Sequence, residues 1–385
     1  MKILLLGGTG VLSKDIALHI LSQGDNVYLL NRGNNRKDIP QHDKCHLIIG
    51  NIRDTEGIKR LIKDQDFDVV VDFLSFNSTH LQNTYGIFAS KCKQYIFISS
   101  CCVFRRSEED GVISENSPKP NTKLPYSIEK YDCEVLLKEI SKFYPCKFTI
   151  VRPYITYGET RIPYGLSPLE RYHWTLIGRI LSGKPFFMWN DGSNRCSLLN
   201  TKDFAKIFYQ LLLNSKAFNE DINITSNSNY TWKQVIEELY KILGSDVNNV
   251  VYIPQYDIVK QLPEYKESLL GDRSLNGIFD NSKLLMIAPK AKSILDNSIT
   301  LHDGLVSTID SYKQNNYYRG IDYRYDARID RMLSRYIKTN DKRRKCIRFV
   351  DYLGNARKKD IAIYLFFRYS SDWLIDVLRK FKKYI

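Results

Sequence analysis

The sequence predicts an α/β fold built on a doubly wound parallel sheet, followed by a smaller α/β region and a basic helical extension. Short aliphatic or β-branched runs alternate with helix-length segments through the first half of the chain. Such alternation requires crossover connections between parallel strands. With 385 residues, of which 43% are hydrophobic, the chain is also long enough to bury a sizeable core in two domains.

Seven runs are predicted as strands, at residues 3–6, 27–30, 46–49, 69–71, 95–98, 148–151 and 222–225. We expect the last of them to rejoin the sheet that the first six form. A crossover helix is predicted over residues 11–23, because Ile16, Ile20 and Leu21 share one side of it and Gly24 stops it. In a sheet of this kind, a ligand is expected at the carboxyl ends of the strands.

A glycine-rich turn joins the first predicted strand to this helix. It reads Gly7-Gly8-Thr9-Gly10-Val11-Leu12-Ser13. Glycine at position 7 or 8 permits a tight turn, Gly10 lets a phosphate approach the backbone, and the helix N-terminus supplies free N–H groups. Ser13 takes the third glycine position as a small residue. The turn therefore predicts a Rossmann-like site for the pyrophosphate of a dinucleotide.

The end of the second strand bears on which dinucleotide binds. A protein specific for NAD usually carries an acid there, but this sequence has Asn31 followed by Arg32. Because Arg32 can pair with a 2′-phosphate, NADP is favoured over NAD. In the alternative interpretation, Arg32 is a solvated loop residue and Asn31 alone binds the 2′-hydroxyl of NAD.

Tyr126 and Lys130 form a candidate proton-transfer pair. A spacing of four places the phenol and the ammonium on one face of a helix, where the cation lowers a phenol pKa whose reference value is about 10. This spacing alone is a weak signal, because the chain contains 26 tyrosines. The strand upstream strengthens it, since Ser100 at its end would deliver a hydroxyl to the same substrate oxygen.

The domain boundaries follow from changes in composition. Residues 1–158 are predicted to form a dinucleotide-binding domain, rejoined by about 192–225, and residues 159–191 with 226–318 a substrate domain. After that the sequence alternates basic and aromatic residues, so 319–385 are predicted to form a separate helical extension. Residues 321–385 hold 18 Lys and Arg against 8 Asp and Glu, or +10 of the net charge of +14.

Several other classes of site are not indicated. The eight cysteines show neither CxxC spacing nor nearby histidine pairs, so we expect no metal site and no disulfide framework. The apolar run at residues 3–6 is too short for a signal peptide or a membrane span. A cytoplasmic protein with reduced thiols is therefore expected.

Several motifs in order resemble the extended short-chain dehydrogenase/reductases, in particular the NAD-dependent epimerase/dehydratase family that modifies sugar nucleotides. Over roughly residues 1–314 these are GGTGVLS (7–13), GNIRD (50–54), DFLSF (72–76), ISSCCVF (98–104), PYSIEK (125–130), VRPYITYG (151–158) and NDGSNRCSLLNTKDFA (190–205). The resemblance implies an NAD(P)-dependent epimerase of a nucleotide-sugar substrate that passes through a keto-sugar. A keto-sugar reductase or dehydrogenase is the alternative, and a non-catalytic RNA-binding relative a less favoured one.

The resemblance also assigns roles to single residues. Tyr126 would move the hydroxyl proton, Ser100 would hold the oxygen, and Lys130 would lower the tyrosine pKa and bind the nicotinamide ribose. The implied cofactor-binding residues are Gly7, Gly8, Thr9, Gly10, Val11, Leu12, Asn31, Arg32, Asn51, Ile52, Phe73, Leu74, Ser75, Pro153, Tyr154 and Ile155. The implied substrate contacts are Arg195 and Tyr154. Because Cys101 and Cys102 replace the Asp-Glu pair of 4,6-dehydratases, dehydration is disfavoured.

The end of the chain is predicted to form a basic amphipathic helix. Its apolar residues are Trp373, Leu374, Ile375, Val377, Leu378 and Phe381, and its basic ones are Arg379, Lys380, Lys382 and Lys383. Such a helix suits peripheral association with an anionic membrane. It equally suits docking on the protein's own body or on the second subunit of a homodimer. We expect residues from about 319 onward to be dispensable for the chemistry, and nucleic-acid binding is not favoured because the charge lies away from the cleft.

Overall fold

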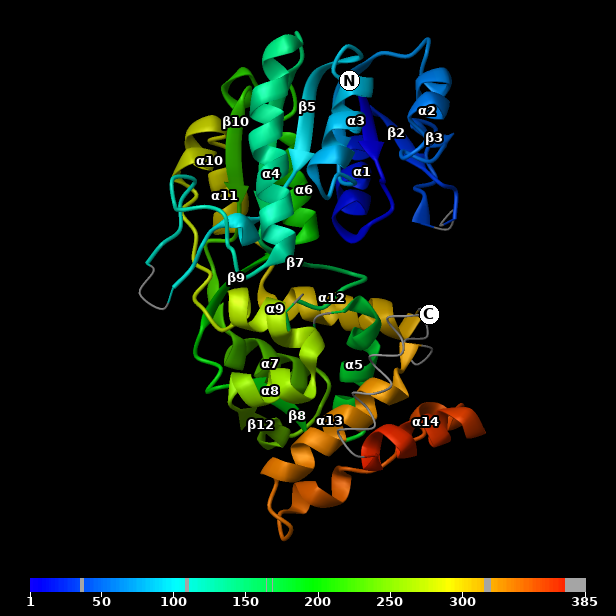
Figure 1. Cartoon of the computed structure of the whole chain (residues 1–385), viewed down its shortest axis with the longest axis vertical. Helices are drawn as coiled ribbons and strands as arrows, with labels where there is room; N and C mark the ends of the chain where they lie inside the picture. Colours follow the sequence, from blue (N-terminus) through cyan, green and yellow to red (C-terminus); the bar gives the residue numbers. More distant parts are fainter. Residues whose placement is uncertain (35–37, 108–110, 164, 168, 315–319, 371–385) are drawn as a thin grey trace. The chain divides into compact units, whose positions relative to one another are not determined.

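The computed structural model describes residues 1–34, 38–107, 111–163, 165–167, 169–314 and 320–370 (Figure 1). They form two compact units. The first comprises Met1–Gly158, Arg195–Asn229 and Leu275–Thr300, and the second comprises Glu159–Asn194, Tyr230–Ser274 and the described residues from Leu301 onward. The predicted amphipathic helix with Trp373 lies outside the described residues.

A seven-stranded sheet in the order β10-β6-β5-β4-β1-β2-β3 forms the centre of the first unit. Its strands are β1 (Lys2–Leu6), β2 (Asn26–Asn31), β3 (Cys45–Ile49), β4 (Phe67–Asp72), β5 (Cys92–Ile98), β6 (Lys147–Pro153) and β10 (Glu220–Ile224). All neighbouring pairs are parallel. The predicted doubly wound sheet is confirmed, including the return of the last strand beside β6.

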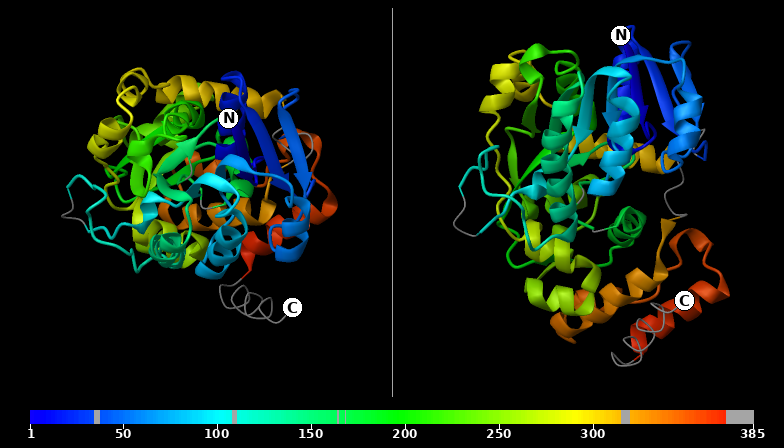
Figure 2. Two further views of the ribbon diagram at one scale, coloured as in Figure 1. Left: turned by 90° about the horizontal axis from the view of Figure 1, so that it is seen from above. Right: turned by 45° about the horizontal axis from the view of Figure 1, so that its top comes forward.

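Helices cover both faces of this sheet (Figure 1, Figure 2). The side chains of β1 alternate, with Ile3 and Leu5 in one apolar cluster and Leu4 and Leu6 in the other. The first cluster includes residues of α1 (Val11–Ser22), α6 (Thr201–Tyr209), α10 (Ser282–Ile287) and α11 (Ala291–Asp296). The second includes residues of α2 (Thr55–Leu61), α3 (Ser78–Phe88) and α4 (Pro125–Ile140). Strands buried on both faces explain why the predicted runs are continuously apolar.

Shorter elements complete the first unit. β7 (Ile155–Tyr157) and β9 (Arg195–Asn200) pair in parallel. The single-turn helices are η2 (Cys101–Val103), η3 (Ser141–Phe143) and η5 (Ser215–Ala217). The sequence predicts that residues 275–300 belong to the substrate domain, but α10 and α11 bury Leu284, Ala291 and Leu295 against the sheet of the first unit.

The second unit is mainly helical. Its helices are α5 (His173–Leu181), α7 (Trp232–Ile242), α8 (Gln255–Gln261), α9 (Lys266–Ser268), α12 (Leu301–Gln314), α13 (Tyr323–Tyr336) and α14 (Lys358–Tyr369). Short helical turns are η4 (Glu170–Tyr172), η6 (Val247–Asn249), η7 (Pro263–Tyr265), η8 (Leu269–Arg273), η10 (Lys342–Cys346) and η11 (Tyr352–Gly354). The strands β8 (Phe186–Trp189) and β12 (Val250–Ile253) pair in parallel. Strand β11 (Asn229–Thr231) begins at the last residue of the segment Arg195–Asn229.

The sequence predicts a separate extension over residues 319–385, but the described residues of this range, 320–370, belong to the second unit. The reason is a cluster of four fully buried charged side chains. Arg179 contacts Asp326 at 2.5 Å and Asp330 at 2.8 Å, and Lys184 contacts the same two carboxylates at 2.8 and 2.6 Å. Helix α13 thereby supplies the counter-charges for two cations near α5.

Within the described ranges, no helix is both long enough and apolar enough to cross a membrane.

Candidate active site

The glycine-rich turn has the backbone geometry that its sequence predicts. Gly7 and Gly8 have φ values of 114° and 77°, in the left-handed region that favours glycine. A Cβ atom on Gly8 would lie 2.5 Å from Cδ2 of Leu29, so no larger residue fits without movement. Gly10 caps α1, and its N–H donates to the buried Ser13 Oγ at 2.9 Å. Ser13 thus packs at the third glycine position and also closes the first helical turn.

The segment after β4 lies beside this turn. The buried Asp72 carboxylate accepts hydrogen bonds from the backbone N–H groups of Leu74 and Ser75 at 2.8 and 3.0 Å, and from the Tyr95 hydroxyl at 2.6 Å. Leu74 lies 3.5 Å from where a Cβ of Gly7 would stand. The structure therefore brings the glycine turn and the predicted cofactor-lining residues 73–75 to one edge of the sheet.

The predicted ribose and adenine residues stand at the next two strand ends. Asn31 Oδ1 accepts from the N–H of Gly33 at 2.8 Å, which orders the loop, while Arg32 is exposed. Ile52 is buried and Asn51 is exposed. Arg53, which sequence reasoning did not single out, donates to the Leu74 carbonyl at 2.6 Å and so connects the two segments.

The three predicted catalytic residues come from two neighbouring elements. Ser100 follows β5, is 9% exposed, and accepts a hydrogen bond from the N–H of Cys102 at 3.2 Å. Tyr126 and Lys130 lie in the first two turns of α4, which begins at Pro125, a residue suited to the first position of a helix. Tyr126 is 44% exposed, whereas Lys130 is 2% exposed.

Lys130 is held at the base of the candidate site. Its Nζ donates to the carbonyls of Ser75 at 2.7 Å and Ile98 at 2.9 Å, which use two of the three donors of an ammonium. The ammonium also lies 4.7 Å from the centre of the Phe97 ring. Burial lowers the pKa of Lys130 to about 8, partly offset by the charge of Asp72. Lys130 thus connects the end of β4 and the end of β5 to the helix that carries Tyr126.

This lowered pKa predicts an alkaline limit to turnover. Above pH about 8, Lys130 loses its proton and can no longer stabilise a tyrosinate at Tyr126, so activity should fall. Measuring kcat/KM against pH should show an alkaline limb near that value. A profile that stays flat up to about pH 10, the ordinary range of lysine, would show that the charge of Lys130 is not needed.

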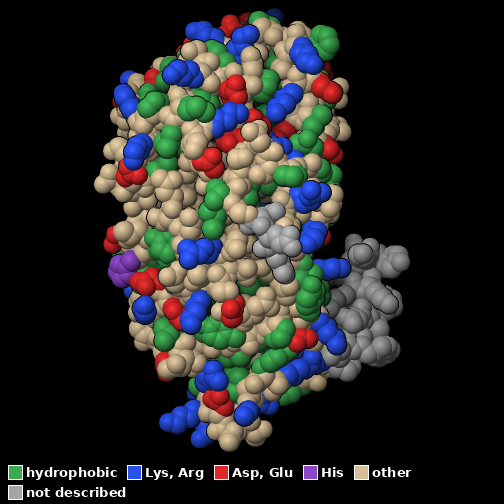
Figure 3. All heavy atoms as spheres, turned by 90° about the vertical axis from the view of Figure 1, so that its left-hand side faces the viewer, with side chains coloured by type: hydrophobic (Ala, Val, Ile, Leu, Met, Phe, Trp, Pro, Cys, Tyr) green, Lys and Arg blue, Asp and Glu red, His purple; other side chains and the backbone are tan. Residues whose placement is uncertain are grey.

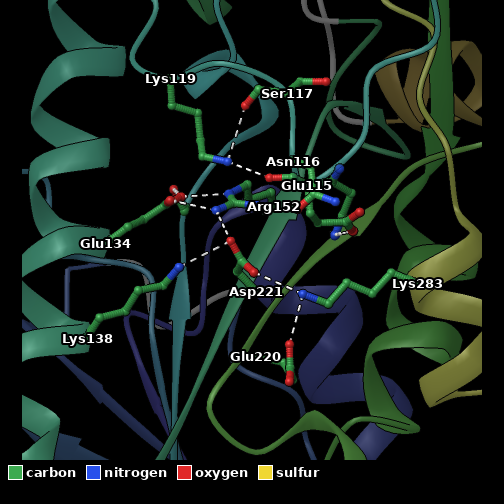
Figure 4. Close-up of polar contacts among 12 residues, drawn as sticks. Glu115, Asn116, Ser117, Lys119, Glu134, Lys138, Arg152, Glu220, Asp221 and Lys283 are labelled. Carbon is green, nitrogen blue, oxygen red and sulfur yellow. Dashed lines mark hydrogen bonds and ion pairs between the residues drawn. The ribbon is translucent and has the colours of Figure 1, made fainter.

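A buried ionic network connects the two elements that carry the predicted catalytic residues (Figure 4). Glu134, one turn after Lys130, accepts from the Ser99 hydroxyl at 2.6 Å and from Arg152 Nε and Nη2 at 2.8 and 2.7 Å. Arg152 also contacts Asp221 at 2.5 Å. Burial alone would lower the pKa of Arg152, but the bonds and charge of Glu134 raise it overall. The hydrogen bond from Ser99 to Glu134 therefore ties α4 to the residue before Ser100.

The segment after β6 contains the other predicted contacts. Ile155 is 2% exposed and therefore packs in the core, while Pro153 and Tyr154 are half-buried. The Tyr154 hydroxyl accepts from Arg106 Nη1 at 2.8 Å, and the guanidinium lies 4.6 Å from the ring centre. Arg106, which is 3% exposed, was not predicted from the sequence.

Arg195, the predicted substrate contact, begins β9. Its side chain is exposed, and its backbone N–H donates to Asn276 Oδ1 at 2.9 Å. The structure places it in the first unit, as it does every other predicted site residue. Their roles in binding and catalysis stay predictions.

A model of the NAD dependent epimerase/dehydratase family matches residues 3–225. Similar curated proteins include the chloroplast stem-loop binding protein of 41 kDa b from Arabidopsis thaliana, 27% identical over 270 residues, which are 65% of this chain and 65% of that protein. The UDP-glucose 4-epimerase of Yersinia enterocolitica is 22% identical over 310 residues, or 68% and 87% of the two chains. A trifunctional UDP-glucose 4,6-dehydratase, epimerase and reductase of Arabidopsis thaliana is 22% identical over 292 residues. The chain spans 65% of the first of these relatives and 39% of the trifunctional one.

Solved structures of similar fold carry NAD. The UDP-glucuronic acid 4-epimerase of Bacillus cereus in complex with NAD superposes with a TM-score of 0.65 and 21% identity, covering 83% of this chain and 98% of that one. The dTDP-glucose 4,6-dehydratase of Streptomyces venezuelae with NAD bound gives a TM-score of 0.66 at 19% identity, covering 84% and 100%. At these identities the likeness shows the shared fold.

Proposed function

Because the chain belongs to the NAD-dependent epimerase/dehydratase family, we propose that it is a nucleotide-sugar epimerase that works with a bound nicotinamide dinucleotide. The observation that carries the proposal is the position of Lys130. Its buried ammonium holds the carbonyls of Ser75 and Ile98, one turn from Tyr126 and at the strand end that leads to Ser100. A serine hydroxyl that holds the oxygen, a phenol that takes the proton and an ammonium that lowers the pKa of the phenol suit the oxidation of a secondary alcohol.

The residues present fit a dinucleotide. Glycines 7 and 8 hold a left-handed turn, and Gly10 leaves the N-terminus of the twelve-residue helix α1 open to a pyrophosphate. The ordered segment 73–75 and Lys130 lie beyond this turn and would hold the nicotinamide half. When bound, the nicotinamide supplies the acceptor and donor of the hydride.

The protein's own residues would manage the proton. Tyr126, deprotonated with the help of the Lys130 ammonium, removes the hydroxyl proton of the sugar, and Ser100 donates a hydrogen bond to the same oxygen. Return of the hydride to the opposite face of the keto-sugar, with the proton returned by Tyr126, gives the epimer. Release of the keto-sugar instead would make the protein a reductase or dehydrogenase, which is the second candidate.

Dehydration is not part of the proposal. Cys101 is fully buried, its thiol donates to the Arg152 carbonyl at 3.2 Å, and burial raises its pKa well above the ordinary value. A thiol that stays protonated in the core cannot serve as the additional acid or base that elimination of water needs.

The proposal is tested with a panel of UDP- and dTDP-hexoses and hexuronates, incubated with the purified protein and either cofactor. We expect one member to give its epimer with no net change in reduced nicotinamide. Stoichiometric oxidation of NADPH with a keto-sugar would instead support the reductase. No turnover of any member with either cofactor would contradict both.

We also propose that Arg32 selects NADP. Arg32→Ala should weaken NADP binding by about 1–3 kcal/mol, the scale of a charge-assisted contact, with little change for NAD. Titration of both cofactors into the variant measures this, with Arg60→Ala, an exposed arginine of α2, as the control. Equal losses for both cofactors, or none, would show that Arg32 does not contact a 2′-phosphate.

A further inference from the structure

Helix α14 exposes an unusual number of large apolar side chains. Leu365 and Ile363 are 46% and 40% exposed, and Ile361, Phe366 and Tyr369 are exposed as well. Only Tyr364 of this helix is buried. Contiguous exposed apolar side chains mark an interaction surface in a folded protein.

This helix is anchored to the body of the second unit. The Tyr364 hydroxyl donates to Asp330 of α13 at 2.5 Å, and the Phe349 ring packs edge-on against the Tyr364 ring with centres 5.3 Å apart. Asp330 is itself part of the buried charge cluster with Arg179 and Lys184. The apolar side chains of α14 are therefore held on a fixed support.

Basic side chains dominate the same part of the chain. Among described residues 320–370, the exposed basic residues are Arg335, Lys338, Lys342, Lys345, Arg348, Arg357, Lys358 and Lys359. Asp351 is the exposed acidic residue of that range. In Figure 3, Lys and Arg side chains lie at the lower end of the molecule, the level at which Figure 1 places the segment that follows α13.

The positive charge is unbalanced because most acids of this range pair with basic side chains that lie outside the exposed set. Asp326 and Asp330 are buried against Arg179 and Lys184. Asp341 pairs with Arg343, and Asp360 pairs with the exposed Arg357, so Arg357 adds little net charge. A ligand that suits this surface therefore carries negative charge and also has an apolar region.

We propose that α14 and the exposed basic residues of this range, other than the paired Arg357, form a surface that binds membranes rich in anionic lipid. Aliphatic side chains such as Ile363 and Leu365 suit the boundary between headgroups and acyl chains, and lysine and arginine suit the lipid phosphates. Nucleic acid would gain little from exposed aliphatic groups, because it binds through phosphates and stacked bases. A second copy of the same surface would bring like charges together. This inference does not depend on the proposed enzymatic activity.

The test is co-sedimentation of the full chain with vesicles of phosphatidylcholine alone and of equal parts phosphatidylcholine and phosphatidylglycerol. We expect binding to the anionic vesicles only, weakening as salt is raised. Lys358→Glu with Lys359→Glu should lower the partition coefficient by roughly tenfold or more. Lys59→Glu with Arg60→Glu, the matched pair of exposed basic residues on α2, should leave it unchanged.

A second pair of variants tests the apolar part. Leu365→Ser should weaken vesicle binding, whereas Met286→Ser, at a methionine of the first unit that is 68% exposed, should not. Equal binding to neutral and anionic vesicles, or equal losses in the control variants, would overturn the proposal. The proposal would also be overturned if the protein did not bind vesicles but bound a stem-loop RNA or dimerised through α14. Turnover of soluble substrate by Leu365→Ser, which lies outside the candidate active site, reports separately on the enzymatic proposal.

Discussion

Replacing Tyr126 by phenylalanine is expected to lower turnover by at least about 10²-fold while leaving dinucleotide binding nearly intact. The change deletes one hydroxyl group from a side chain that is 44% exposed at the start of α4. The glycine turn, the segment after β4 and the hydrogen bonds of Lys130 to backbone carbonyls do not depend on that hydroxyl. Steady-state kinetics with the substrate found in the panel measures the first effect, and cofactor titration measures the second.

The matched control is Tyr256→Phe, at a tyrosine of α8 in the second unit that is 68% exposed. It should keep full turnover. If Tyr126→Phe turned over at a near-wild-type rate, the proposed proton transfer by this residue would be wrong, even with the cofactor bound.

Neutralising Asp326 should have the largest effect on stability, a loss of about 3–5 kcal/mol in the free energy of unfolding. Asp326→Asn keeps the shape of the side chain but leaves two buried cations, Arg179 and Lys184, facing one carboxylate. Burial by itself would raise the pKa of Asp326, but Lys184 and Arg179 lower it, so the group is ionised at neutral pH. Urea unfolding followed by circular dichroism measures the loss.

Asp351→Asn is the control, because Asp351 is exposed and outside the cluster. A loss no larger in Asp326→Asn than in this control would mean that the cluster contributes little. The same cluster predicts that a chain ending at residue 319 does not fold, since it would lack both carboxylates. A shortened protein that folds and turns over substrate within a few-fold of the full chain would contradict this and would restore the expectation of a dispensable extension.

The strands and the glycine turn could be predicted because their signals are local. Continuous apolar runs identify strands, most of which are buried on both faces, and the structure extends the first six predicted strands by one to three residues at one or both ends. The positive φ angles of Gly7 and Gly8 follow from the turn itself. Likewise, a spacing of four between Tyr126 and Lys130 fixes their common face as soon as the helix forms.

Contacts between distant charged residues could not be predicted. Asp326 and Asp330 are four apart in a basic, polar segment, a pattern typical of a solvated helix face. Their partners Arg179 and Lys184 lie some 140 residues earlier, so nothing local shows that all four are buried. The extension was therefore wrongly separated from the second unit.

The same reason explains the site residues that sequence reasoning missed. Glu134 lies four residues after Lys130 on α4, a spacing that places it on the same helix face, but a glutamate is usually a surface residue. Its burial depends on Arg152 arriving from β6. Arg106 in turn depends on the position of Tyr154. Such side chains become part of a site only through tertiary packing.

The proposed chemistry requires that the first unit bind a nicotinamide dinucleotide. Mass spectrometry of the small molecules released by denaturing the purified full-length protein tests it, with titration of NAD and NADP into the cofactor-free protein as the complement. We predict release of one of these dinucleotides, or saturable rebinding of at least one of them. A folded protein that releases neither dinucleotide and binds neither on titration would contradict the account.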